Sequence, residues 1–255
     1  MSGILRRWMW LGVAFAVGAI AYPAERWSER MMATALLRAD PDRAPLDSRL
    51  AAFAASLAKP AYAVHCATCH GADMRGNSSL GAPNLIDADW LYGSGKVSEI
   101  ERTLYFGIRA GNKKTRNLAD MPAFGRPTAP GVRYKVTPLA PDEIRAVIAY
   151  LFQIEGRPAD PAAAERGRDV YLNKGGCYDC HSPHGHGDPG IGAPNLTDAI
   201  WLYGDGSADS IFRTIEVGRK GVCPAWVDRL PPATIRALAI YLHIQSHPAE
   251  ADAVR

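Results

Sequence analysis

The sequence predicts a mainly α-helical protein with two tandem domains that follow a single N-terminal membrane helix. Three observations support this fold class. A fifteen-residue block recurs 111 residues later, each copy ends in a segment with the apolar spacing of a helix, and no segment alternates apolar and polar residues as a half-buried strand does. The 255 residues have room for two domains of about 100 residues each.

The N-terminus carries two arginines and then an uncharged run from Trp8 to Tyr22. The interpretation we favour is a membrane anchor, because aromatic residues lie at both ends of the run and the arginines favour the cytoplasm for the N-terminal side. A cleaved signal peptide is the alternative, because the run is shorter than the roughly 20 residues that cross hydrocarbon and it ends near an Ala-x-Ala site. Both interpretations place the remaining chain in the bacterial periplasm, either anchored to the inner membrane or soluble.

The internal duplication defines the domain organisation. GAPNLIDADWLYGSG at 81–95 recurs as GAPNLTDAIWLYGDG at 192–206, with twelve of fifteen positions identical. A period this long exceeds solenoid units and indicates tandem domains. MPAF at 121–124 matches CPAW at 223–226, so the first copy has gained nine residues, mostly GNKKTRNLAD. The predicted bounds are 1–30 for the anchor or signal segment, 31–50 for a linker, 51–157 for the first domain and 158–255 for the second.

Within each copy we expect a short opening helix and a longer closing helix. The opening helices are expected around 50–62 and 162–171, and the closing helices within 138–156 and 230–247. The closing segments begin with proline and with acidic or hydroxyl residues, and their apolar residues then fall on one helical face. Loops rich in Gly, Pro and Asn lie between, and GRPAD at 156–160 is the expected linker between the copies.

Four of the five cysteines lie in two C-x-x-C-H motifs, Cys66-Ala-Thr-Cys69-His70 and Cys177-Tyr-Asp-Cys180-His181. This motif is the attachment signature of c-type haem, in which two thiols bind the vinyl groups and the histidine ligates the iron. A redox dithiol is disfavoured because no strand-helix-strand pattern surrounds the motifs, and a zinc site because its cysteine pairs are normally closer together. The sequence therefore predicts two covalently attached haem c groups, with His70 and His181 as proximal ligands.

The second axial ligand differs between the copies. In the first copy, Met121 lies in the loop ADMPAFG before the closing helix and is the expected distal ligand of that haem. The second copy has no methionine, and Cys223 occupies the matching position. We expect Cys223 to ligate the second iron as thiolate, which would give that haem a much lower potential. His184, His186, His243 and His247, an inert packing role beside a five-coordinate iron, and an intermolecular disulfide remain open alternatives.

On these motifs the two domains resemble class I cytochromes c, and the whole arrangement resembles the dihaem subunit, subunit III, of cbb(3)-type cytochrome c oxidases. The GAPNL-x-D-x-x-WLYG block, present twice, carries this resemblance more specifically than C-x-x-C-H does. The resemblance implies that a carbonyl at or beside Pro83 and Pro194 orients each proximal histidine. It also implies that Trp90, Tyr92, Trp201 and Tyr203 line the haem edges, and that Arg109 and Arg219 either bind propionates or are solvated surface charges. Cys223 departs from the pattern, which has Met-Pro-Ala in both copies.

The function that follows from the resemblance is electron transfer in a respiratory chain. The donor would be a soluble cytochrome or a quinol-oxidising complex, and the acceptor a terminal oxidase or another membrane complex, without an active site in this chain. The alternatives are a sulfur-oxidising dihaem enzyme similar to thiosulfate dehydrogenases and a haem-based redox or gas sensor. The inserted Lys113, Lys114 and Arg116 are either a docking patch for an acidic partner or a solvated loop. The formal charge of +3 is too small to predict binding to nucleic acid.

Overall fold

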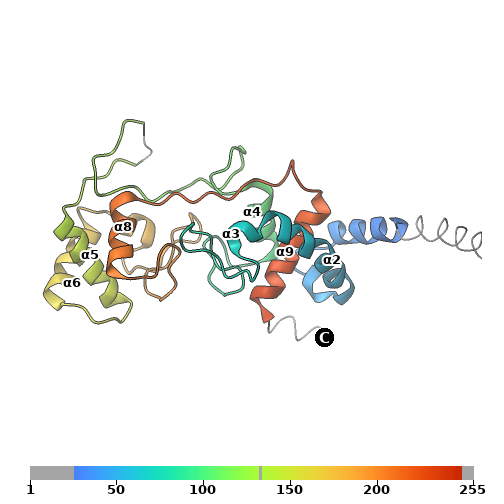
Figure 1. The fold of residues 1–255 in the computed structure, drawn as a ribbon, viewed down its shortest axis with the longest axis horizontal. Coiled ribbons are helices and arrows are strands. Elements are labelled where there is room, and N and C mark those ends of the chain that lie inside the picture. Colours follow the sequence, from blue (N-terminus) through green and yellow to red (C-terminus); the bar gives the residue numbers. More distant parts are fainter. Residues whose placement is uncertain (1–25, 132–133, 249–255) are drawn as a thin grey trace, which may run out of the picture.

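The computed structural model of the chain describes residues 26–131 and 134–248 (Figure 1). The described part is mainly helical and contains isolated β-bridges but no strand, as the sequence predicts. Most of the expected anchor lies outside the described residues. Within them, no helix is both long and apolar enough to span a bilayer. After a helix at 26–38, the elements are η1 (Ala44–Leu46), α2 (Ser48–His65), α3 (Ala67–His70), α4 (Val97–Phe106), α5 (Pro141–Ile154), α6 (Pro161–Leu172), α7 (Tyr178–His181), α8 (Ala208–Val217) and α9 (Pro232–Ser246).

Short polar side chains fix where several helices begin. The Asp47 carboxylate accepts hydrogen bonds from the backbone N–H groups of Arg49 and Leu50 at the start of α2, and Asp160 accepts one from Ala163 at the start of α6. These bonds satisfy N–H groups that have no partner within the helix. Both closing helices, α5 and α9, carry proline in their first turn, where its missing N–H costs nothing.

The helices form two packed bodies, and each body takes its closing helix from the other copy. The first body packs α2 and α4 against α9, and the second packs α6 and α8 against α5. Their cores follow the same division, because Ile235 and Leu238 of α9 lie with Ala58 of α2, whereas Ile144 of α5 lies with Tyr171 of α6. Figure 1 shows α5, α6 and α8 at one end of the molecule and α2, α4 and α9 at the other. The ranges 51–157 and 158–255 are thus sequence copies rather than separate packed units.

Two extended segments carry the chain across between the bodies, along one side of the molecule (Figure 1). Residues 107–126 leave α4 and reach the second body, where the Phe124 N–H donates to the Ile215 carbonyl of α8. Residues 218–231 make the return path, and the Trp226 N–H donates to the Leu104 carbonyl of α4. The segments pair with each other through two isolated bridges, Ile108 with Cys223 and Met121 with Arg219. Each copy of the duplicated sequence therefore contributes its closing helix to the body of the other copy.

The GAPNL and WLYG loops of the two copies meet in contacts related by the same offset of 111 residues. The Gly93 N–H donates to the Pro189 carbonyl, and the Gly204 N–H donates to the Ser78 carbonyl, each at 3.2 Å. A Cβ atom on Gly81 would lie 2.0 Å from the Tyr203 ring, and one on Gly192 would lie 2.1 Å from the Tyr92 ring. Only glycine lets the backbone of each loop come this close to the tyrosine ring of the other copy. The two loops therefore make matching contacts.

The segment before α2 is bound to the first body by Arg236 of α9. The Arg236 Nε donates to the Glu101 carboxylate of α4 at 2.7 Å, and both side chains are 11% exposed. The Arg236 Nη1 donates to the carbonyls of Leu36 and Ala39, at the end of the helix at 26–38. The last helix of the structure thus fixes the first one in place.

Candidate haem-binding site

Each C-x-x-C-H motif forms one helical turn, α3 or α7, that directs its histidine toward a cavity. The His70 Nδ1 lies 3.0 Å from the Pro83 carbonyl oxygen, and the His181 Nδ1 lies 2.9 Å from the Pro194 carbonyl oxygen. A histidine that donates from Nδ1 keeps the Nε2 lone pair for a metal. The expected orientation of both proximal histidines by carbonyls at Pro83 and Pro194 is therefore confirmed.

A cavity of about 1070 Å³ runs along both motifs. Its lining includes all four motif cysteines, His70, His181, Met121 and Cys223. The expected positions of Trp90, Tyr92, Trp201 and Tyr203 at this cavity are also confirmed. The volume lies at the upper end of the range for ligand pockets, which suits more than one large apolar group. The two motifs thus share one continuous space rather than two isolated pockets.

The two distal candidates lie in exchanged bodies, Met121 in the second and Cys223 in the first. Met121 packs against the core of the second body, as do Cys177, Leu196 and Trp201. Cys223 lies close enough to Cys66 and Cys69 for their charges to raise its pKa. From the sequence, Met121 and Cys223 are each expected at the motif of their own copy. In the structure, the crossing segments 107–126 and 218–231 place each of them in the body that holds the other motif.

The histidine alternatives for the second iron lie elsewhere. His184 and His186 are exposed, and their rings are tilted relative to each other by 48° with centroids 6.3 Å apart. His243 is buried in the first body, where its Nδ1 lies 2.8 Å from the Gly95 carbonyl oxygen, and it stacks on His247. None of the four lines the cavity in the part of the chain that the structure describes.

Burial raises the pKa of several cysteine thiols at the cavity. It raises the pKa of Cys66 to about 11 and that of Cys177 to about 12, and it also raises the pKa of Cys180. The pKa of Cys223 rises to about 11, first through burial and then through the nearby Cys66 and Cys69. Burial also lowers the pKa of His70 and His181, which keeps both imidazoles neutral and able to ligate.

One buried donor supports the fit of a haem in this space. The Trp90 Nε1 is buried and has no hydrogen-bond partner among the described residues. A buried indole N–H normally finds a partner, so an acidic group of a bound ligand at the cavity fits this site. The equivalent Trp201 Nε1 instead lies 3.4 Å from the Glu155 carboxylate. The residues present therefore fit a haem, because two histidine-bearing C-x-x-C-H turns lie at one cavity beside a buried donor without a partner among the described residues.

Arg116, which the sequence placed in the inserted basic loop, packs on Tyr92, a residue that lines the cavity. The Arg116 guanidinium lies over the Tyr92 ring at 5.0 Å and its Nε donates to the Thr103 hydroxyl. Arg219 makes the same two contacts in the second body, with Tyr203 and Thr214. Arg219 is therefore the equivalent of Arg116 and not of Arg109, the expected match, because the insertion obscures the alignment of the two copies.

Arg109 has a different role. Its Nε donates to the Gly221 carbonyl, and its Nη1 donates to the Ala119 carbonyl. Arg109 thus connects the two crossing segments, although its side chain still borders the cavity.

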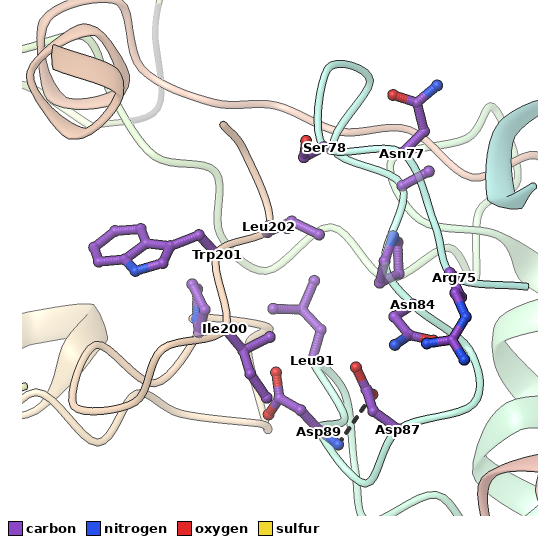
Figure 2. Close-up of a pocket in the computed structure, with 13 residues that line it drawn as sticks. Arg75, Asn77, Ser78, Asn84, Asp87, Asp89, Leu91, Ile200, Trp201 and Leu202 are labelled. Carbon is purple, nitrogen blue, oxygen red and sulfur yellow. Dashed lines mark hydrogen bonds between the residues drawn. The ribbon is translucent and has the colours of Figure 1, made fainter. Parts of the chain in front are cut away.

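A second, smaller cavity of about 110 Å³ lies where the two copies meet (Figure 2). Its lining includes Asp87, Asp89 and Trp201, and the Asp89 N–H donates to the Asp87 carboxylate at 3.2 Å. Burial first, and then the charge of Asp198, raise the pKa of Asp87 and Asp89. This space is too small for a cofactor, so it belongs to the contact between the copies.

Comparison with known proteins gives matches for both copies. Residues 55–155 match the family model of cytochrome c, and residues 162–242 match that of subunit III of cbb3-type cytochrome c oxidase. The chain is 40% identical over 198 residues to "Cbb3-type cytochrome c oxidase subunit FixP" of Bradyrhizobium sp. (strain ORS 278), and 37% identical over 197 residues to the CcoP subunit of Cereibacter sphaeroides. Each match covers 77% of this chain and 63% of the relative.

The chain thus spans somewhat less than two thirds of the length of these curated relatives. Within that span the matches include both C-x-x-C-H motifs and agree with the two histidine-bearing turns at one cavity. The chain is therefore a homologue of subunit III of cbb3-type cytochrome c oxidases, and its two cytochrome c domains carry two covalently attached haem c groups.

Proposed function

We propose that the chain is a membrane-tethered dihaem electron carrier that works in or beside a terminal oxidase complex. It would accept electrons from a soluble cytochrome or a quinol-oxidising complex and deliver them to the oxidase. The observation that carries this proposal is the shared cavity, in which both proximal histidines and both distal candidates line one continuous space. Two redox centres in one space support electron transfer between them.

The proposed ligand sets follow the exchanged geometry. His70 and Cys223 would ligate the iron attached to Cys66 and Cys69. His181 and Met121 would ligate the iron attached to Cys177 and Cys180. When bound, each haem supplies a one-electron Fe(III)/Fe(II) couple. The chain orients both histidines through proline carbonyls, and the shared cavity would hold both cofactors.

The two irons should differ strongly in potential. A thioether favours Fe(II) relative to stronger donors, whereas an anionic thiolate favours Fe(III). The first haem, rather than the second, is therefore the proposed low-potential centre, because Cys223 lies in the first body. Electrons would rest mainly on the second haem, beside Met121.

A redox titration combined with low-temperature electron paramagnetic resonance tests both the function and the ligands. The full chain should give two potentials and one thiolate-type low-spin ferric signal. Cys223→Met should remove that signal and raise the lower potential, because a thioether then replaces the thiolate. A double variant, Cys66→Ala with Cys69→Ala, should lose the thiolate signal together with one haem.

The matched control is Cys177→Ala with Cys180→Ala, which should lose the high-potential haem and retain the thiolate signal. Retention of the thiolate signal in the first double variant and its loss in the control would refute the exchanged assignment. Two overlapping potentials with no thiolate signal would show that Cys223 is a packing residue.

A further inference from the structure

The two crossing segments present an exposed apolar pair between the bodies. The bridge between Met121 and Arg219 brings the segments 107–126 and 218–231 side by side, and its antiparallel register continued by three residues leads to Leu118 and Val222. Two contacts agree with this register. The Asp120 carboxylate lies 3.7 Å from the Lys220 ammonium, and Arg109 donates to the carbonyls of both Ala119 and Gly221.

This pair is both accessible and close to the distal ligands. Leu118 is 62% exposed and Val222 is 64% exposed, and both border the large cavity. Val222 directly precedes Cys223, and Leu118 lies three residues before Met121. A molecule bound on this pair would lie at the entrance to the space that holds both haems.

Basic residues accumulate along the same stretch of chain. Between residues 107 and 136 the sequence has seven basic residues and one acid, Asp120, although the whole chain carries only +3. Lys113, Lys114 and Lys135 are exposed. Asp120 is paired with Lys220, which is itself 64% exposed. In Figure 1 the loop after α4 and the loop before α5 both project from the side along which the crossing segments run.

We propose that this surface, formed by Leu118 and Val222 with Lys113, Lys114, Lys135 and Lys220, docks an acidic redox protein. The proposal rests on the proposed electron-transfer function. The partner would carry carboxylates around an apolar patch, since such complementarity raises the association rate and selects partners. One electron passes between the redox centre of the partner and a haem iron, so that one is oxidised as the other is reduced, and no bond or proton moves.

The position of the apolar pair favours a redox protein over an anionic lipid surface. A lipid-binding patch needs basic charge but gains nothing from lying at the entrance of a cofactor cavity. A redox protein needs this position, because transfer requires close approach to the cofactor. The helix at 26–38, which leads toward the expected anchor, extends from the end of the molecule rather than from this side (Figure 1).

The test uses the full haem-loaded chain in mild detergent, reduced and then mixed with oxidised acceptors in a stopped-flow instrument. The acidic acceptor is a plant-type plastocyanin, and the mismatched one is a basic mitochondrial cytochrome c. Lys113→Glu with Lys114→Glu should slow the plastocyanin reaction about tenfold at low salt and accelerate the cytochrome c reaction. The matched control, Arg49→Glu with Lys59→Glu on α2, makes the same charge change elsewhere and should remain near the wild type.

A second variant tests the apolar part of the surface. Leu118→Ser should slow the plastocyanin reaction and leave its dependence on ionic strength unchanged, because no charge is altered. Equal rates in the Lys113/Lys114 variant and the α2 control would overturn the proposal. The proposal would also be overturned if the Lys113/Lys114 variant lost its binding to phosphatidylglycerol vesicles but kept its rate with plastocyanin. The surface would then bind lipid rather than a redox protein.

Small acceptors separate failure of this proposal from failure of the proposed function. Ferricyanide and a cationic cobalt phenanthroline complex should both oxidise the wild-type haems. If neither reagent oxidises them, the electron-transfer function itself is wrong. If both react and the lysine substitutions have no effect on plastocyanin, only the docking surface is wrong.

Discussion

The buried ion pair between Arg236 and Glu101 allows a quantitative prediction about how the exchanged closing helix is held. Arg236→Met keeps most of the aliphatic stem but leaves the Glu101 carboxylate, whose residue is 8% exposed, without its 2.7 Å partner. It also removes the donor to two carbonyls of the segment that precedes α2. Removing one member of a buried pair costs about 3–5 kcal/mol. We therefore expect the free energy of unfolding to fall by about 4 kcal/mol.

Arg145 of α5 provides a matched control, because it occupies the equivalent position in the second body. It is exposed, and its guanidinium lies over the Phe212 ring at 5.5 Å without a buried carboxylate. Arg145→Met should cost about 0.5–1 kcal/mol, the usual value of an exposed cation–π contact. The assay is urea unfolding of the haem-loaded chain, followed by far-ultraviolet circular dichroism and extrapolated linearly to water.

A double variant separates the unpaired charge from other effects. Arg236→Met with Glu101→Leu removes both charges and should recover most of the loss, because replacing a whole buried pair with apolar residues is often close to neutral. The reasoning is refuted if Arg236→Met costs no more than Arg145→Met. It is also refuted if the double variant is less stable than Arg236→Met alone, since the cost would then come from packing.

Two further predictions concern packing and charge. Gly167→Ala should destabilise the second body by about 3 kcal/mol or more, because its Cβ would lie 1.8 Å from the Ala146 carbonyl oxygen where α6 crosses α5. Gly111→Ala, with nothing within 4 Å of its Cβ, should change stability by less than about 0.5 kcal/mol in the same urea assay. At pH 7 the Asp87→Asn variant should melt at a higher temperature than the wild type. Near pH 3.5 the two proteins should melt at the same temperature. Burial and Asp198 raise the pKa of Asp87 in the folded chain, so its contribution to stability is complete below its unfolded pKa of about 3.9 and is lost as the pH rises. An equal gain at both pH values would contradict this cause.

The sequence predicted most of the local structure and the cofactor. The repeated block, the helical spacing and the C-x-x-C-H motifs depend on short stretches of chain, and the structure has the expected helices and both histidine turns. Even the positions of Trp90 and Trp201 at the cavity followed from the family resemblance. These features depend on short stretches of chain or on the repeated block itself.

Which closing helix packs in which body could not be predicted from the sequence. The α5 and α9 segments carry equivalent residues, such as Ile144 and Ile235, at equivalent positions, so either helix presents an apolar face that suits either body. Which helix packs in which body depends on the course of residues 107–126 and 218–231 through space. A pattern of residue types does not predict that course. The equivalence of Arg116 and Arg219 was hidden for a related reason, because Arg116 lies in the insertion, where the copies cannot be aligned.

The exchange of closing helices also constrains how the protein can be made. A chain that emerges in order from its N-terminus exposes the first C-x-x-C-H motif long before α9 is available to cover it, and Arg236 must find the Leu36 carbonyl across 200 residues. Contacts that are so distant in sequence form late and slowly. The first motif therefore stays open to the haem attachment machinery until nearly the whole chain is available to fold. For the same reason, each copy expressed alone would lack the closing helix that packs on it in the full chain.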